Sequence, residues 1–355
     1  MHPYKHIKPY QHWTKALSET INSDVDPVRN FNLKINPQDK IATAGSCFAQ
    51  HISRYLPNLN LQLYIEEKGS LLLTDDLLTK YNYNVFSARY GNIYTSRQLL
   101  QLLLRAKNKF SPTDSAWVTE QNRWYDPYRP SIEPNGFASK EELLRDRQQH
   151  LHSVAKMFSS LDVFIFTLGL TETWINKIDG AIYPVCPGVI AGTFNHEAHE
   201  FVNLGVKDVI EDMNLFLAEL TKINPKAQII LTVSPVALKA TALNRHIIES
   251  NSVSKSILRA AADQIQQENS NVYYFPSYEI ITSQHNRGKY LDSDSRSILE
   301  SGVSYVMSLF SKHAVDERSY TSLNNFKEDL EKNKMTAFET DMDKIVTAIC
   351  DEDFL

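Results

Sequence analysis

A serine and a cysteine stand side by side on a tight turn near the start of this chain. The apolar run at residues 41–44 predicts a short buried strand, and residues 50–56 predict a helix. Ser46 and Cys47 lie between them. A small hydroxyl or thiol side chain at such a turn lies at the carboxyl edge of a sheet and at a helix N-terminus, where α/β proteins bind anions or stabilise an oxyanion. Ser46 is therefore the first candidate nucleophile, and Cys47 is its rival.

Apolar runs and amphipathic segments alternate along the rest of the chain. Buried strands are predicted at 40–44, 163–167, 228–233 and 272–275. Helices are predicted between and after them, at about 47–56, 96–106, 139–160, 206–223, 252–268 and 297–311. Strands that alternate with helices predict the α/β class, here a three-layer, doubly wound parallel sheet of flavodoxin-like type with helical and irregular insertions.

Polar residues follow three of the predicted strands. Ser46 follows the first, Thr171 and Glu172 follow the second, and Ser234 follows the third. A further polar segment, 290–297, precedes the last predicted helix. Because the carboxyl ends of parallel strands converge on one crevice, we expect these segments to meet there. A nucleophile near the N-terminus and an acid near the end of the domain suit a hydrolase.

The predicted domain organisation has three parts. Residues 1–38 form an N-terminal extension packed on the core, and 39–312 form the α/β domain, with an insertion at about 107–138. Residues 313–355 form a C-terminal helical extension. The stretch 177–200 is rich in turn residues and is predicted to be a loop.

Bulk properties exclude several classes of protein. The chain has 355 residues, 42% of them hydrophobic, which is typical of a globular α/β protein. A net charge of −5 gives no general attraction to nucleic acid or anionic membranes, so we expect no nucleic-acid partner. Its longest apolar stretch, 163–170, falls far short of the roughly 20 residues that a membrane span needs. Three widely separated cysteines and a polar N-terminus favour a cytoplasmic location.

Neither a metal nor a cofactor is predicted. His196 and His199 are three residues apart, not the four of a zinc-protease helix motif, so the pattern is not specific for a metal site. The aromatic residues of the insertion leave two interpretations open, a sugar-binding cleft or packing of the insertion onto the core. These residues are Trp117, Trp124, Tyr125 and Tyr128.

Five sequence blocks resemble one known family. Residues 45–49 read Gly-Ser-Cys-Phe-Ala, the motif for which the GSCFA-domain proteins are named. Four more blocks are similar to the family in the same order, at 86–95, 167–174, 231–236 and 274–281. The chain therefore resembles a member of this family, which belongs to the SGNH/GDSL hydrolase superfamily.

The resemblance implies a serine esterase or O-acyltransferase. The superfamily mostly hydrolyses or transfers ester-linked acyl groups, often acetyl groups on carbohydrate, and needs no cofactor. Proteins of the family resemble components of surface-polysaccharide biosynthesis, which implies a glycan or small-molecule ester substrate and possible polysaccharide-assembly partners. The alternative is a catalytically degenerate binding or scaffold protein of the same process.

The resemblance also implies roles for single residues. Ser46 matches the superfamily's nucleophile, and Gly91 matches a glycine whose N–H group is a second oxyanion donor. Thr171 stands where the superfamily has its oxyanion asparagine. Arg89 and Asn92, in the same block as Gly91, are candidate substrate-binding residues. Arg296 is a further candidate to hold an anionic or sugar group.

The residue that takes the serine proton is not where the superfamily has it. The chain has Asp294 and Ser297 in place of the Asp-x-x-His pair, so the base histidine is missing. His246 is the predicted substitute, with Asp294 orienting it, and His285 is the second choice. Glu172 is a third candidate base if burial raises its pKa.

Overall fold

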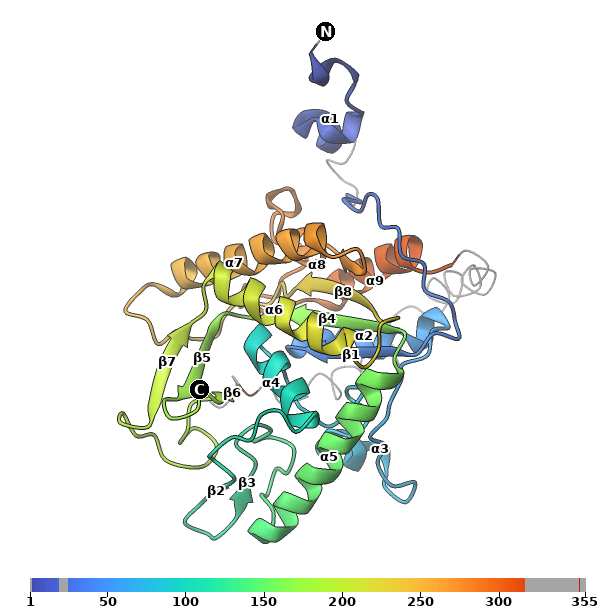
Figure 1. The fold of residues 1–355 in the computed structure, drawn as a ribbon. Helices are drawn as coiled ribbons and strands as arrows, with labels where there is room; N and C mark the ends of the chain where they lie inside the picture. The colour runs from blue at the N-terminus through green and yellow to red at the C-terminus, as the bar shows by residue number, and fades with distance from the viewer. Residues whose placement is uncertain (1, 19–24, 317–350, 352–355) are drawn as a thin grey trace.

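A four-stranded parallel sheet forms the centre of the protein. The computed structural model describes residues 2–18, 25–316 and 351. The sheet has the order β1-β4-β8-β9, with β1 at Ile41–Gly45, β4 at Val163–Leu168, β8 at Gln228–Val233 and β9 at Val272–Tyr274 (Figure 1). On the outer side of β1, Leu63 forms a parallel bridge with Ile41. The strand order therefore changes direction at β1, and ligands of open α/β sheets bind at such a switch point.

Helices cover both faces of this sheet. On one face lie α4 (Ser96–Ala106), α5 (Lys140–Ser160), α6 (Val206–Thr221) and α7 (Ile247–Glu268). On the other lie α2 (Cys47–Tyr55), α8 (Ser277–Thr282) and α9 (Glu300–Ala314). Two separate hydrophobic clusters fill the space between the sheet and these two layers. The predicted α/β class with a three-layer parallel sheet is confirmed.

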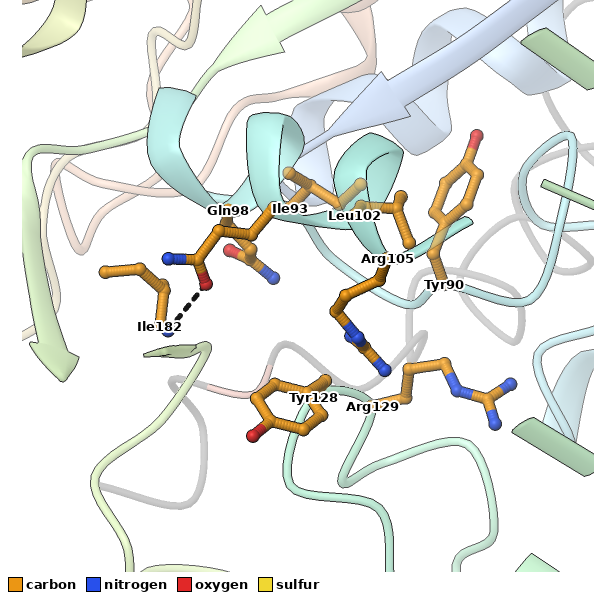
Figure 2. A pocket seen from close by; sticks show the side chains of 9 residues that line it. Tyr90, Ile93, Gln98, Leu102, Arg105, Tyr128, Arg129 and Ile182 are labelled. Atoms are coloured by element: carbon orange, nitrogen blue, oxygen red, sulfur yellow. Dashed lines mark hydrogen bonds between the residues drawn. The ribbon is translucent and has the colours of Figure 1, made fainter. Parts of the chain in front are cut away.

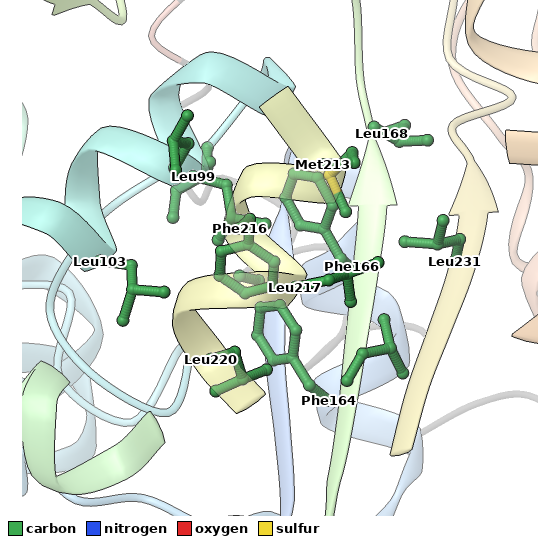
Figure 3. Packing of buried hydrophobic residues seen from close by; sticks show 14 of the residues in the cluster. Leu99, Leu103, Phe164, Phe166, Leu168, Met213, Phe216, Leu217, Leu220 and Leu231 are labelled. Atoms are coloured by element: carbon green, nitrogen blue, oxygen red, sulfur yellow. The ribbon is translucent and has the colours of Figure 1, made fainter. Parts of the chain in front are cut away.

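Alternation along β4 shows how the sequence builds both layers. Phe164 and Phe166 point toward α6 and α4, whereas Val163 and Ile165 belong to the cluster under α2 and α9 (Figure 3). Phe216 of α6 packs against Phe164 with ring centroids 5.8 Å apart. This period-two pattern explains why the strand reads as one continuous apolar run, because both of its faces are buried.

The region after β4 differs from the prediction. Residues 177–200 were expected to form a loop, but the structure has a second, antiparallel sheet in the order β6-β5-β7. Its strands are β5 (Glu172–Asn176), β6 (Ile182–Tyr183) and β7 (His199–Asn203). β5 pairs with β7 across more than twenty residues, a contact that no local sequence pattern reports. Trp174 and Phe201 stack edge to face across this pair and help to hold it.

Smaller elements complete the described part of the chain. The insertion contains a short hairpin of β2 (Trp117–Val118) and β3 (Trp124–Tyr125). The remaining helices are α1 (Trp13–Ser18), α3 (Asp75–Lys80), and the 3-10 turns η1 (Pro3–His6), η2 (Pro9–Gln11), η3 (Pro57–Leu59) and η4 (Gln284–Asn286). The predicted C-terminal extension, 313–355, lies outside the described residues apart from 313–316 and 351.

Candidate active site

Ser46 lies between the end of β1 and the start of α2. It is the N-cap residue of α2, with extended backbone dihedrals. Gly45 before it has a φ of +147°, and a Cβ at that position would lie 2.6 Å from the carbonyl oxygen of Thr167 on β4. No other residue fits that position without displacing the neighbouring strand, because every other residue carries a Cβ. The glycine thus brings Ser46 close to the carboxyl edge of the sheet.

The hydroxyl of Ser46 is buried and makes no capping bond. The side chain is 4% exposed, and Oγ has no hydrogen-bond partner among the described residues. An N-cap serine normally accepts a bond from an N–H group of the first helical turn, but no such bond is formed here. Leaving a buried hydroxyl unsatisfied costs about 1–3 kcal/mol. Ser46 therefore does not stabilise the first turn of α2 through its side chain.

Ser46 lines a small cavity at the sheet's carboxyl edge. The cavity has about 250 Å³ of empty space, part of it open to solvent. It is lined by residues from β1–α2, from the segment before α4, and from the turns after β4 and β8, together with one residue of α7. These are Ser46, Cys47, Tyr94, Gly169, Leu170, Ser234, Val236, Ala237, Leu238 and Lys255. The structure thus brings the predicted turns at Ser46 and Ser234 together.

Lys255 of α7 supplies the amine in this lining. It is 2% exposed, and Nζ donates a hydrogen bond to the Gly169 carbonyl oxygen at 2.7 Å. Gly169 also packs on Ser46: a Cβ added to the glycine would lie 3.0 Å from the Ser46 Cβ. Gly169 therefore contacts both Lys255 and Ser46. Among the described residues that line the cavity, none is a histidine.

The first turn of α2 provides N–H groups beside Ser46. The first N–H groups of a helix have no acceptor within the helix, and the helix dipole places partial positive charge at this end. The N–H groups of Gly169 and Leu170 are engaged, since both donate to the Tyr94 carbonyl oxygen at 3.0 and 3.1 Å. A developing oxyanion on a substrate bound at Ser46 would face the start of α2.

Thr171 and Glu172 take part in packing outside this lining. The Thr171 N–H group donates to Ser254 Oγ at 3.1 Å, and its hydroxyl donates to Asn203 Oδ1 at 2.6 Å. Glu172 accepts a 2.7 Å bond from the Thr241 hydroxyl. Burial raises the pKa of Glu172. Both side chains therefore connect β5 to neighbouring segments, and neither lines the Ser46 cavity.

The structure does not bring His246, His285 or Asp294 into the cavity lining. His246 is exposed at the N-cap of α7, where Nδ1 accepts a 3.2 Å bond from the Ile248 N–H group. His285 lies in η4. Asp294 accepts a 2.6 Å bond from the Ser297 hydroxyl, and this bond contributes most to a lowered pKa of Asp294. Asp294 and Ser297 thus bond to each other within a local turn.

Gly91 and Asn92 lie just before Tyr94, which lines the cavity. Gly91 has a φ of +68°, a conformation that favours glycine. Asn92 is buried, accepts a bond from Gln50 Nε2 at 3.0 Å and donates from Nδ2 to Asp351 Oδ2 at 3.4 Å. The Asp351 N–H group in turn donates to the Tyr94 hydroxyl at 3.1 Å. Asp351 therefore lies beside the cavity wall, a position that no motif in the sequence indicates.

Arg89 belongs to a buried charge cluster away from Ser46. Its guanidinium pairs with Asp146 at 2.9 Å and with Glu133 at 3.0 Å. It also stacks on the Tyr83 ring at 4.0 Å. These contacts account for the burial of the Arg89 guanidinium without a bound substrate. Arg296 lies nearer the cavity, where Nε donates to the carbonyl oxygen of Ala237, a lining residue, at 3.0 Å.

Within the described residues there is neither a candidate metal cluster nor a helix that could span a membrane. No group of three or more histidine, cysteine or carboxylate side chains within them is arranged to hold a metal ion. No helix in that part of the chain combines the length and apolar character needed to cross a membrane.

Comparison with known proteins gives one family match. A sequence model of the GSCFA family matches residues 40–310. No curated protein sequence matches the chain.

Two solved structures show weak structural similarity. One is a carbohydrate esterase family 2 enzyme with a carbohydrate-binding domain from Corynascus thermopiles (Myceliophthora fergusii), at 9% identity and a TM-score of 0.22, covering 46% of this chain and 38% of that one. The other is an acetyl xylan esterase from the rumen bacterium Butyrivibrio proteoclasticus, at 16% identity and a TM-score of 0.22, covering 70% and 56%. This chain thus spans about two fifths and just over half of their respective lengths.

Proposed function

The chain belongs to the GSCFA family, and we propose that it is a serine esterase or O-acyltransferase of the SGNH type that works through an acyl-Ser46 intermediate. One observation carries the proposal. The Ser46 hydroxyl is buried at the switch point of the sheet, lines a cavity and has no hydrogen-bond partner among the described residues. A hydroxyl held in that state is available to a substrate carbonyl group.

We propose Lys255 as the base that replaces the missing histidine. In this role Lys255 acts as the neutral amine, the form of a lysine side chain that accepts a proton. Lys255 Nζ takes the proton of Ser46 as Oγ bonds to the carbonyl carbon of the ester. The C–O bond to the leaving group then breaks, and Nζ returns the proton to the leaving oxygen. Water or an acceptor hydroxyl then attacks the acyl-Ser46 ester and gives its proton to Nζ. The bond between the acyl carbon and Oγ breaks, Nζ returns a proton to Oγ, and the free acid or the new ester leaves.

The cavity size favours a small acyl group. The Ser46 cavity has about 250 Å³ of empty space when its open part is included, and its enclosed part holds about one water molecule. An acetyl group is the acyl group that needs the least widening of this space, and the rest of the ester would remain outside. We propose a carbohydrate ester as the substrate class on the resemblance to the superfamily.

A fluorophosphonate probe tests this proposal, because it labels an activated serine covalently. We expect the probe to label wild-type protein on Ser46, as mapped by peptide mass spectrometry. Ser46→Ala should remove the label, and Cys47→Ala should keep it. Labelling of Cys47, or equal labelling of the Ser46→Ala variant, would contradict the mechanism. A folded wild-type protein that is not labelled would favour the binding or scaffold alternative, which the absence of a histidine from the described cavity lining supports.

A further inference from the structure

A second cavity lies between α4 and the insertion. It has about 330 Å³ of empty space, part of it open to solvent. Four of its lining residues come from α4, and the others come from the segment before α4, from the insertion and from β6 (Figure 2). It shares no lining residue with the Ser46 cavity. Nothing in the proposed reaction uses it.

Arg105 points into this second cavity from α4 (Figure 2). The residue is 7% exposed, and no described residue accepts a hydrogen bond from its guanidinium or forms an ion pair with it. Its Nη2 atom is fully buried. The guanidinium lies over the Tyr128 ring, 4.1 Å from the centroid, a contact that leaves its N–H groups without an acceptor.

The polar neighbours of Arg105 are already engaged. Asp126 has the strongest opposite charge nearby, but it pairs with Arg129 at 3.0 Å and with Arg147 at 2.8 Å. Gln101 accepts from the Ile182 N–H group at 2.8 Å and donates to the Gly180 carbonyl oxygen at 2.8 Å (Figure 2). Neither Asp126 nor Gln101 accepts a hydrogen bond from the Arg105 guanidinium, since both are engaged with other described residues.

A buried, unpaired guanidinium is costly for a folded protein. Transferring a charge out of water is offset only by a partner charge or by hydrogen bonds. Burial lowers the pKa of Arg105 to about 10, which leaves it charged at neutral pH. The site therefore carries one positive charge with several N–H donors directed at a cavity.

We propose that this cavity binds a small oxyanion group, such as a phosphate or a carboxylate, with Arg105 as its main ligand. The guanidinium offers two parallel N–H donors, the geometry in which arginine binds such groups most strongly. Burial and the contact with the Tyr128 ring already restrict the guanidinium, so little side-chain entropy is lost on binding. The proposal is independent of Ser46.

Thermal unfolding in the presence of inorganic phosphate tests the proposal. With sodium chloride at matched ionic strength as the reference, we expect phosphate to raise the Tm of wild-type protein by about 2 °C at about ten times its dissociation constant. Acetate in place of phosphate reports whether a carboxylate is accepted. Arg105→Met should lose this shift, and Arg145→Met, which removes an exposed arginine from α5, should retain it. Phosphate also stabilises folded proteins in general, because it is excluded from their surface. Comparing the Tm shifts of the two variants corrects for this non-specific effect.

Stability without added anion separates a ligand-binding arginine from a structural one. Because Arg105 lacks an acceptor, Arg105→Met should melt at or above the wild-type temperature. If Arg105→Met does not fold, Gln101→Glu serves as the test variant. A carboxylate four residues before Arg105 on α4 would pair with the guanidinium and take the place of the anion. Gln101→Glu should lose the anion shift. Equal shifts in wild type and in Arg105→Met, or no shift with phosphate or acetate in wild type, would overturn the proposal.

Discussion

Replacing Lys255 by methionine removes one amine and leaves an unbranched side chain of similar length. If Lys255 accepts the Ser46 proton, turnover of an activated acetate ester should fall by about 10²–10⁴, the usual contribution of a positioned base. That loss corresponds to roughly 3–5 kcal/mol in the activation free energy. KM should stay within about twofold, because a proton acceptor adds nothing to ground-state binding.

The same substitution also changes the fold locally. The Gly169 carbonyl loses its 2.7 Å donor, which costs about 1–3 kcal/mol, and removing a buried amine offsets part of that. Gly169 packs on Ser46, so a loss of activity in Lys255→Met alone does not distinguish a base from a positioning residue.

Lys255→Arg makes that distinction. Arginine still donates to the Gly169 carbonyl oxygen but does not give up its proton at neutral pH. We expect a folded Lys255→Arg variant to be as slow as Lys255→Met, and Lys255→Ala to regain part of its rate when ethylamine is added. Lys207→Met, which changes an exposed lysine, is the matched control.

Steady-state kinetics with p-nitrophenyl acetate, next to thermal melts of each variant, is the assay. Either of two results would refute the role of Lys255 as the base. One is a kcat of Lys255→Met within about threefold of wild type, far less than a general base contributes. The other is a folded Lys255→Arg variant with full activity.

Three further outcomes are expected. Gly169→Ala should lower kcat by about tenfold with little change in fold. The new Cβ would lie 3.0 Å from Ser46 Cβ, so Ser46 must shift by a few tenths of an ångström, and a displacement of about 1 Å costs about 10² in rate. Unchanged kinetics would contradict the close contact. Burial lowers the pKa of His51 to about 4, so the unfolded chain binds more protons below about pH 6.5. This one group should lower the free energy of unfolding by roughly 2 kcal/mol between about pH 7 and pH 5. Urea titrations at both pH values should therefore give a loss that is smaller by about that amount in His51→Phe than in wild type, and equal losses would contradict the lowered pKa. His246→Ala should retain kcat within about twofold in the same ester assay, because His246 is an exposed helix cap that does not line the described cavity. A hundredfold loss of kcat would instead indicate that His246 acts as the base.

The sequence was sufficient to predict the parallel sheet and the position of Ser46. Both faces of β4 are buried, so the strand appears as an uninterrupted apolar run, and α4 begins and ends at the predicted residues because its leucines share one face. The antiparallel pair of β5 and β7 was not predicted, since its register depends on contacts far apart in the chain.

The residues around Ser46 were harder to predict than its turn. Lys255 precedes Leu258, Ala262 and Ile265 by three, seven and ten residues, so it falls on the apolar face of α7. That position is a signal for a buried lysine, whereas the superfamily's Asp-x-x-His pattern predicts a histidine base such as His246. Arg105, by contrast, resembles any basic residue in the last turn of a helix, and its missing partner is visible only in three dimensions.

Intact-protein mass spectrometry during turnover tests the acyl-Ser46 intermediate most directly. Mixing the protein with excess p-nitrophenyl acetate and quenching in acid before one turnover is complete should trap a species heavier by one acetyl group. Peptide mapping should place that group on Ser46, and Ser46→Ala should neither acquire it nor release p-nitrophenol above the uncatalysed rate. An acetyl group mapped to Cys47 or Lys255, or turnover retained in Ser46→Ala, would contradict the claim that Ser46 is the nucleophile.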